Sequence, residues 1–152
     1  MARGEKAIFT NMCMIYDDKG NVVVQDRKDP DWPGVVFPGG HVEPQEPFYT
    51  SVVREVKEET GLDIEKPQLC GVKQFHTEDG ARYVVLLYKT NQFSGTLKSS
   101  DEGDVFWVPI AELPNYQLAQ SFKYMLPVFL DDDISEYYSY QDENENWLYD
   151  LY

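Results

Sequence analysis

Three glutamates stand close together in the chain, and their spacing is its strongest chemical signal. Glu55, Glu58 and Glu59 occupy positions i, i+3 and i+4, so in a helix they share one face. Like charges on one face repel one another unless a cation compensates them. Carboxylate oxygens suit Mg²⁺ or Mn²⁺ better than zinc. The spacing therefore indicates a site for a hard divalent cation, with Arg54 one turn before Glu58 as a fixed positive charge.

A glycine pair and a helix must position these carboxylates. Gly39 and Gly40 lack a Cβ, which lets the backbone pass close to the metal site. The helix is expected over residues 46–60, because apolar residues recur there every four positions and Gly61 supplies a stop signal.

The remaining segments alternate between strand and helix patterns. A second amphipathic helix is expected over residues 117–130, where Pro127 should end or kink it. A loop is expected over 29–34, and the end of the chain resembles a β-hairpin around a polar turn. Runs of apolar and β-branched residues predict further strands at 7–16, 21–27, 68–75, 81–90 and 104–108.

The segment from Gly40 to Leu62 also carries a complete motif. It reads Gly40, five residues, Glu46, seven residues, and then Arg54-Glu-Val-Lys-Glu-Glu-Thr-Gly-Leu62. This resembles the Nudix box, G-x5-E-x7-R-E-U-x-E-E-x-G-U, at every specified position. Average composition gives a chance occurrence on the order of 10⁻⁷ or less. The resemblance implies an α+β fold of the Nudix type, an α/β/α sandwich with a central mixed β-sheet flanked by helices.

The resemblance also implies a set of metal ligands. The candidates are the carbonyl of Gly39 and the side chains of Glu55, Glu58 and Glu59, and the expected cation is Mg²⁺, with Mn²⁺ as a second possibility. Related enzymes add an acidic residue from a later loop. Glu102, just before the strand expected at 104–108, is the matching candidate.

Catalytic roles follow from the same resemblance. Water attacks phosphorus, and a glutamate takes the proton, for which Glu55 and Glu58 are both candidates. Arg54 corresponds to the arginine that orients the glutamates, and Glu46 to a structural partner of the loop and helix.

Substrate contacts are expected outside the glutamate cluster. Arg27 stands where similar enzymes place an arginine that contacts a substrate phosphate, and Gly40 belongs to the passage that admits the phosphates. Phe37, Trp32 and Tyr83 could stack on a base or belong to the core. Amide side chains that could read a purine edge are Asn11, Gln117 and Gln120.

Within the family, the small size of the chain and two missing sequence features narrow the range of expected substrates. No proline occurs between Pro67 and Pro109, where ADP-ribose-type members usually carry one, and the NADH-type signature is missing. The chain looks most like the MutT-like nucleoside triphosphate pyrophosphohydrolases, which include enzymes for 8-oxo-dGTP. Hydrolysis of nucleotide sugars or dinucleoside polyphosphates is the alternative, and a non-catalytic nucleotide-binding module is a third reading.

Charge and length set the broad class. The 152 residues fit one domain, 1–152, and the net charge of −14 argues against binding a nucleic-acid polymer. Residues 131–152 form an acidic, aromatic extension with eight acidic and no basic residues, which could be a self-association surface, a lid or an extension of the sheet. We expect a nucleotide substrate, no membrane partner, a monomer or homodimer, and a cytoplasmic location, since Cys13 and Cys70 lack metal or disulfide spacing.

Overall fold

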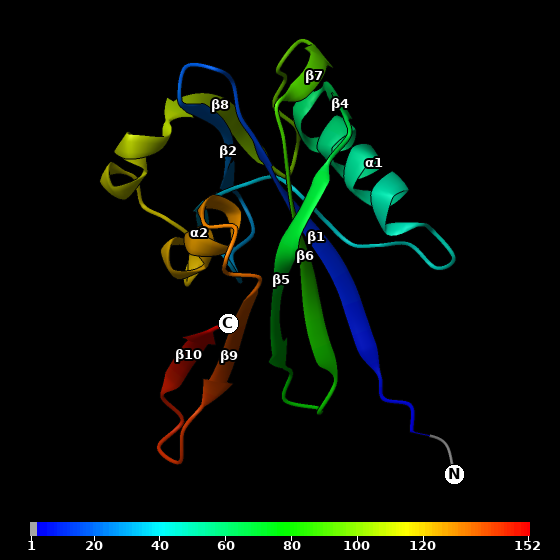
Figure 1. Cartoon of the computed structure of the whole chain (residues 1–152), viewed down its shortest axis with the longest axis vertical. Coiled ribbons are helices and arrows are strands. Elements are labelled where there is room, and N and C mark those ends of the chain that lie inside the picture. Colours follow the sequence, from blue (N-terminus) through cyan, green and yellow to red (C-terminus); the bar gives the residue numbers. More distant parts are fainter. Residues whose placement is uncertain (1–2) are drawn as a thin grey trace.

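A five-stranded mixed sheet forms the centre of the protein (Figure 1). The computed structural model describes residues 3–152. In spatial order the strands are β1 (Ala7–Ile15), β6 (Arg82–Thr90), β5 (Gln68–His76), β9 (Glu136–Gln141) and β10 (Trp147–Leu151). The pairing is parallel between β1 and β6, antiparallel between β6 and β5, parallel between β5 and β9, and antiparallel between β9 and β10.

A second, three-stranded antiparallel sheet lies beside the first. Its central strand is β2 (Asn21–Arg27), which pairs with β3 (Gly34–Val36) and β8 (Gly103–Pro109). A short ladder joins β4 (Leu62–Glu65) to β7 (Gln92–Gly95). The sequence patterns did not predict β3, β4 and β7, because strands of three or four residues are too short to show a period.

Helices cover both faces of the central sheet, as expected for the sandwich. Side chains alternate along β1, so Met12 and Met14 enter one core cluster with α2 (Phe122–Leu130), whereas Cys13 and Ile15 enter another with α1 (Phe48–Thr60). A 3-10 helix, η1 (Ile110–Asn115), follows β8. No helix within residues 3–152 is both long enough and apolar enough to cross a membrane.

The first helix begins two residues later than its expected start at residue 46. Its N-cap is Pro47, whose backbone is extended, and the Pro47 carbonyl accepts the first bond from the Ser51 N–H at 3.0 Å. The end at Gly61 is confirmed. Gly61 adopts a φ of 77°, and its N–H donates to the Lys57 carbonyl, which closes the helix.

The second helix is shorter than the expected segment 117–130. It begins at Phe122, because Ser121 has a φ of 72° and cannot continue a helix backward. Pro127 does not end the helix, which runs on to Leu130. Burial of its apolar side chains in the core compensates the hydrogen bond that Pro127 cannot donate.

The predicted hairpin at the end of the chain is confirmed and extends the central sheet. β9 and β10 pair from Trp147↔Gln141 to Leu151↔Tyr137. Because β9 also pairs with β5 at Lys73↔Tyr137, the hairpin adds two strands to one side of the sheet, with β10 at the edge.

Candidate active site

A pocket of about 560 Å³ opens between the central sheet and the segment that joins β2 to β3. It gathers seven of the residues expected at the site from segments far apart in the sequence. Arg54 and Glu58 lie outside the lining, on the helix that forms one wall. The seven are Arg27, Phe37, Gly39, Gly40, Glu55, Glu59 and Glu102.

The two glycines are held against the site by direct contact. A Cβ on Gly39 would overlap the Asn11 carbonyl, and one on Gly40 would overlap the Glu55 carboxylate. The Gly39 N–H donates to Glu59 Oε2 at 3.0 Å. Close approach, and not a left-handed backbone, therefore explains why these positions require glycine.

Asn11 fixes this passage to the helix. Its Oδ1 accepts the Gly40 N–H at 3.1 Å, and its Nδ2 donates to Ser51 Oγ at 2.9 Å. The backbone N–H of Asn11 donates to the Gly40 carbonyl at 2.8 Å. The buried amide thus positions the loop, in place of the purine-edge contact considered from the sequence.

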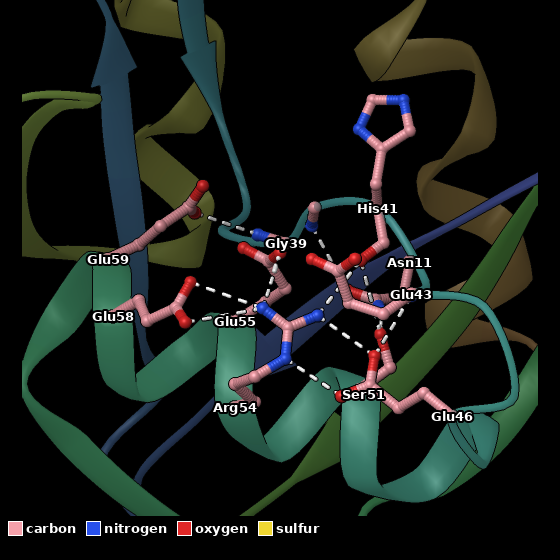
Figure 2. A network of polar contacts seen from close by, with 11 residues as sticks. Asn11, Gly39, His41, Glu43, Glu46, Ser51, Arg54, Glu55, Glu58 and Glu59 are labelled. Atoms are coloured by element: carbon pink, nitrogen blue, oxygen red, sulfur yellow. Dashed lines mark hydrogen bonds and ion pairs between the residues drawn. The ribbon is translucent and has the colours of Figure 1, made fainter.

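Arg54 connects three carboxylates, as Figure 2 shows. Its Nε and Nη2 donate to Glu46 at 2.8 and 2.9 Å, and its Nη1 donates to Glu55 at 3.0 Å and to Glu58 at 3.2 Å. Hydrogen bonds from Arg54 hold the pKa of Glu46 at about 2. The residue expected to orient the glutamates therefore contacts two of them directly, and its third partner anchors it.

The carboxylates differ in burial along the helix face. Burial raises the pKa of Glu59 to about 7 against the opposing hydrogen bond from Gly39, and it also raises the pKa of Glu55. Glu59 is 5% exposed, whereas the Glu58 side chain is 57% exposed. The buried Glu59 and the half-buried Glu55 line the pocket, whereas Glu58 lies outside its lining.

This donor set fits a hard divalent cation. Glu55 and Glu102 both raise the pKa of Glu59 by repulsion, so positive charge at this point would relieve buried like charges. All donors are oxygens, which Mg²⁺ prefers. Among residues 3–152 no three acidic, histidine or cysteine side chains are already clustered as ligands, and Glu58 is turned toward Arg54.

The pocket lining also includes Lys73 and Phe75, to which the sequence analysis gave no role. Lys73 is 9% exposed, and burial lowers its pKa to about 8. It shares the lining with Phe75, Tyr83 and Trp32. The sequence does carry a signal for this residue. Lys73 stands two positions before Phe75, so both lie on one strand face, which is otherwise apolar.

Two of the expected substrate residues have partners in the protein. Arg27 donates to the Asp29 carboxylate and to the Trp32 carbonyl, each at 3.0 Å. Phe37 is 1% exposed and packs edge-to-face against Phe122 and Phe129. Phe37 therefore shapes the pocket floor from within the core, and a ring so buried offers no face for stacking on a base.

The chain is similar to known proteins in both sequence and structure. The model of the NUDIX domain family matches residues 9–129. The Nudix hydrolase YvcI of Bacillus subtilis is 32% identical over 115 residues, which cover 72% of this chain and 70% of YvcI. The crystal structure of the MutT protein of Bacillus halodurans superposes with a TM-score of 0.78 and 24% identity, covering 95% of this chain and 97% of that one.

Two shorter matches carry names with a substrate. A human protein named 8-oxo-dGDP phosphatase is 35% identical over 51% of this chain and 24% of its own length. A protein of Methanocaldococcus jannaschii named ADP-ribose pyrophosphatase is 32% identical over 58% of this chain and 53% of its own length. In both, the matched segment is only part of the relative.

Proposed function

The chain belongs to the NUDIX family of hydrolases, and we propose that it cleaves a phosphoanhydride bond in a nucleoside diphosphate-linked substrate. The leading substrate class is the nucleoside triphosphates, cleaved to the monophosphate and pyrophosphate. The observation that carries this proposal is the pocket, whose lining combines the carboxylates of Glu55, Glu59 and Glu102 with aromatic rings. Such a pocket suits a ligand with phosphates at one end and a planar ring at the other.

The carboxylate end would hold Mg²⁺, or Mn²⁺ in its place. We assign the ligands to Glu55, Glu58, Glu59, Glu102 and the Gly39 carbonyl. When bound, the cation neutralises charge on the phosphate oxygens and lowers the pKa of the attacking water. Gly40 leaves room for the Glu55 carboxylate, because a Cβ at this position would overlap it, and we assign to the Gly40 backbone the passage that admits the phosphates.

Proton transfer falls to a glutamate of α1. Glu55 lines the pocket, and its raised pKa suits a group that must take a proton near neutral pH. Glu58 remains the second candidate from its more exposed position. Arg54 is a positioning residue for both, since one guanidinium nitrogen contacts each of them.

The names of the relatives leave two substrate classes in view. The human relative named 8-oxo-dGDP phosphatase supports a purine nucleotide with a simple phosphate chain. The archaeal relative named ADP-ribose pyrophosphatase supports a nucleotide sugar, which is the second candidate. A module that binds without cleaving is disfavoured by the complete glutamate set.

A substrate panel separates these possibilities. Purified protein with Mg²⁺ would be incubated with nucleoside triphosphates including 8-oxo-dGTP, nucleoside diphosphates including 8-oxo-dGDP, ADP-ribose and dinucleoside polyphosphates. We expect the highest kcat/KM for a triphosphate, with monophosphate and pyrophosphate as products by chromatography. A strong preference for ADP-ribose or a dinucleoside polyphosphate would overturn the triphosphate assignment, and tight binding without any turnover would overturn the hydrolase.

A further inference from the structure

Lys73 is a charged side chain beside aromatic rings in the pocket lining, on β5, which β6 separates from the strand β1 that contacts Gly40. It comes from β5, whose neighbour β9 contributes Tyr137. The Lys73 Nζ lies 5.4 Å from the ring centre of Trp32, 5.7 Å from that of Phe75 and 5.7 Å from that of Tyr137. Three rings from three separate segments therefore hold one ammonium group at the pocket surface.

The ammonium of Lys73 lacks an anionic partner. Within residues 3–152 its side chain forms no ion pair and donates no hydrogen bond, and burial alone accounts for its lowered pKa. The other cation of the lining, Arg27, is paired with Asp29. A buried charge without a partner is unfavourable. The Lys73 ammonium is therefore a hydrogen-bond donor that a ligand can satisfy.

The surroundings favour a planar ring over a phosphate as that ligand. Phe75 and Tyr83 both belong to the pocket lining and stack on each other with ring centres 4.9 Å apart, so the lining near Lys73 is largely aromatic. A phosphate group would be better served by several unpaired cations, and Lys73 is a single one beside a neutralised Arg27.

Hydrogen-bond direction then selects among bases. An ammonium group donates and cannot accept. All three purines present an acceptor at N7, but guanine and hypoxanthine add a second acceptor at O6, whereas adenine places there an amino donor that would oppose Lys73.

We propose that Lys73 is a specificity-determining residue that selects purine nucleotides with an oxygen at C6 over those with an amino group there. This inference rests on the proposed function, because it assumes that the phosphates lie at the glutamate end and the base at the aromatic end.

The first experiment uses the unmodified protein and two substrates that differ at C6. Inosine triphosphate and adenosine triphosphate would be compared with Mg²⁺ at equal concentrations. We expect kcat/KM to be roughly 10- to 100-fold higher for the inosine compound, the discrimination typical of one well-placed base contact. Equal values would overturn the proposal without any variant.

Variants assign the preference to Lys73. Lys73→Met keeps a long apolar stem inside the aromatic rings, and it should reduce the inosine-to-adenosine ratio of kcat/KM to near unity. Lys73→Arg, which keeps donors, should retain part of the ratio. Lys89→Met is the matched control, because Lys89 is also partly buried on the neighbouring strand but pairs with Asp132 outside the pocket. It should keep the wild-type ratio.

A binding measurement separates failure of this inference from failure of the proposed hydrolysis. Inosine and adenosine monophosphates would be titrated into wild type and Lys73→Met by calorimetry. A preference for the inosine compound that Lys73→Met removes supports the inference even if no nucleotide is cleaved. If nucleotides are cleaved but Lys73→Met weakens both substrates equally, Lys73 contacts the phosphates or only the fold, and the inference is wrong.

Discussion

Arg54 holds together carboxylates that would otherwise repel one another. Its guanidinium contacts Glu46, Glu55 and Glu58 and also donates to the His41 carbonyl at 3.1 Å. Lysine carries the same charge but has a single nitrogen, so it cannot hold this set of acceptors at once. The geometry of the glutamates, and not only their charge, therefore depends on arginine at this position.

Replacing Arg54 by lysine should lower activity more than stability. We expect Arg54→Lys to reduce kcat by roughly 10- to 100-fold and to raise the Mg²⁺ concentration needed for half-maximal rate, as for other groups that orient metal ligands. Arg82→Lys is the control, because Arg82 pairs with Glu5 away from the pocket. An Arg54→Lys enzyme with wild-type kcat and Mg²⁺ dependence would contradict the positioning role.

Glu59 should give the protein an unusual response to pH. Burial raises its pKa from 4.5 to about 7, so between these values the folded protein keeps a proton that the unfolded chain releases. The free energy of unfolding should therefore fall as pH rises through this window. Glu59→Gln should remove this component, and Glu65→Gln on the exposed surface of β4 should keep it.

The measurement is the melting temperature at several pH values with a chelator present and then with Mg²⁺. Added Mg²⁺ should raise the melting temperature of wild type more at pH 8 than at pH 5.5, because a ligand carboxyl must first lose its proton. The same shift in Glu59→Gln as in wild type would show that Glu59 is not a ligand.

Side-chain chemistry was predictable from sequence where residues lie close together along the chain. The common face of Glu55, Glu58 and Glu59 follows from helical spacing alone. Lys73 was missed because two of its three aromatic partners, Trp32 and Tyr137, come from segments distant in the sequence. For Phe37 the sequence left both a core position and a base contact open, because a pattern cannot tell a core ring from one that lines a cavity.

At the scale of elements, the passage before α1 carries two glycines with different neighbours. A Cβ at Gly39 would meet the rigid backbone of Asn11, whereas one at Gly40 would meet the movable end of the Glu55 side chain. The Gly39 contact therefore constrains the fold, whereas the Gly40 contact constrains the position of the Glu55 side chain.

The two alanine substitutions should therefore affect different properties, stability in one case and activity in the other. Gly39→Ala should destabilise the protein by about 1–3 kcal/mol through overpacking, measured by denaturant unfolding. Gly40→Ala should change stability little and should lower kcat, because Glu55 must move. Equal loss of stability in both variants, with Gly40→Ala as active as wild type, would contradict this assignment.

Long elements were predicted well and short ones poorly. α1 and the strands β1, β2, β5, β6 and β8 were placed to within two residues, because each spans at least seven residues with a clear pattern. The start of α2 depends on the backbone of Ser121, which no local pattern indicated. The terminal hairpin was expected as a hairpin, but its parallel pairing with β5 is a non-local contact.

For the whole molecule, the negative net charge opposes the binding of an anionic ligand in the pocket. The proposed substrate is an anion, whereas the protein carries a net charge of −14. Eight acidic residues lie in segment 131–152, and the pocket lining combines three glutamates and Asp29 with Arg27 and Lys73. A cation bound at the glutamates would reverse the local charge where the phosphates must lie.

Hydrolysis by glutamine variants of the two candidate bases tests the glutamate face of α1 most directly. With the best nucleotide of the panel and saturating Mg²⁺, wild type should turn over, and Glu55→Gln or Glu58→Gln should lower kcat by about 10²- to 10⁴-fold. Glu65→Gln, which removes an equal charge outside the pocket, should remain near wild type. Wild-type kcat in both Glu55→Gln and Glu58→Gln would contradict catalysis at this face.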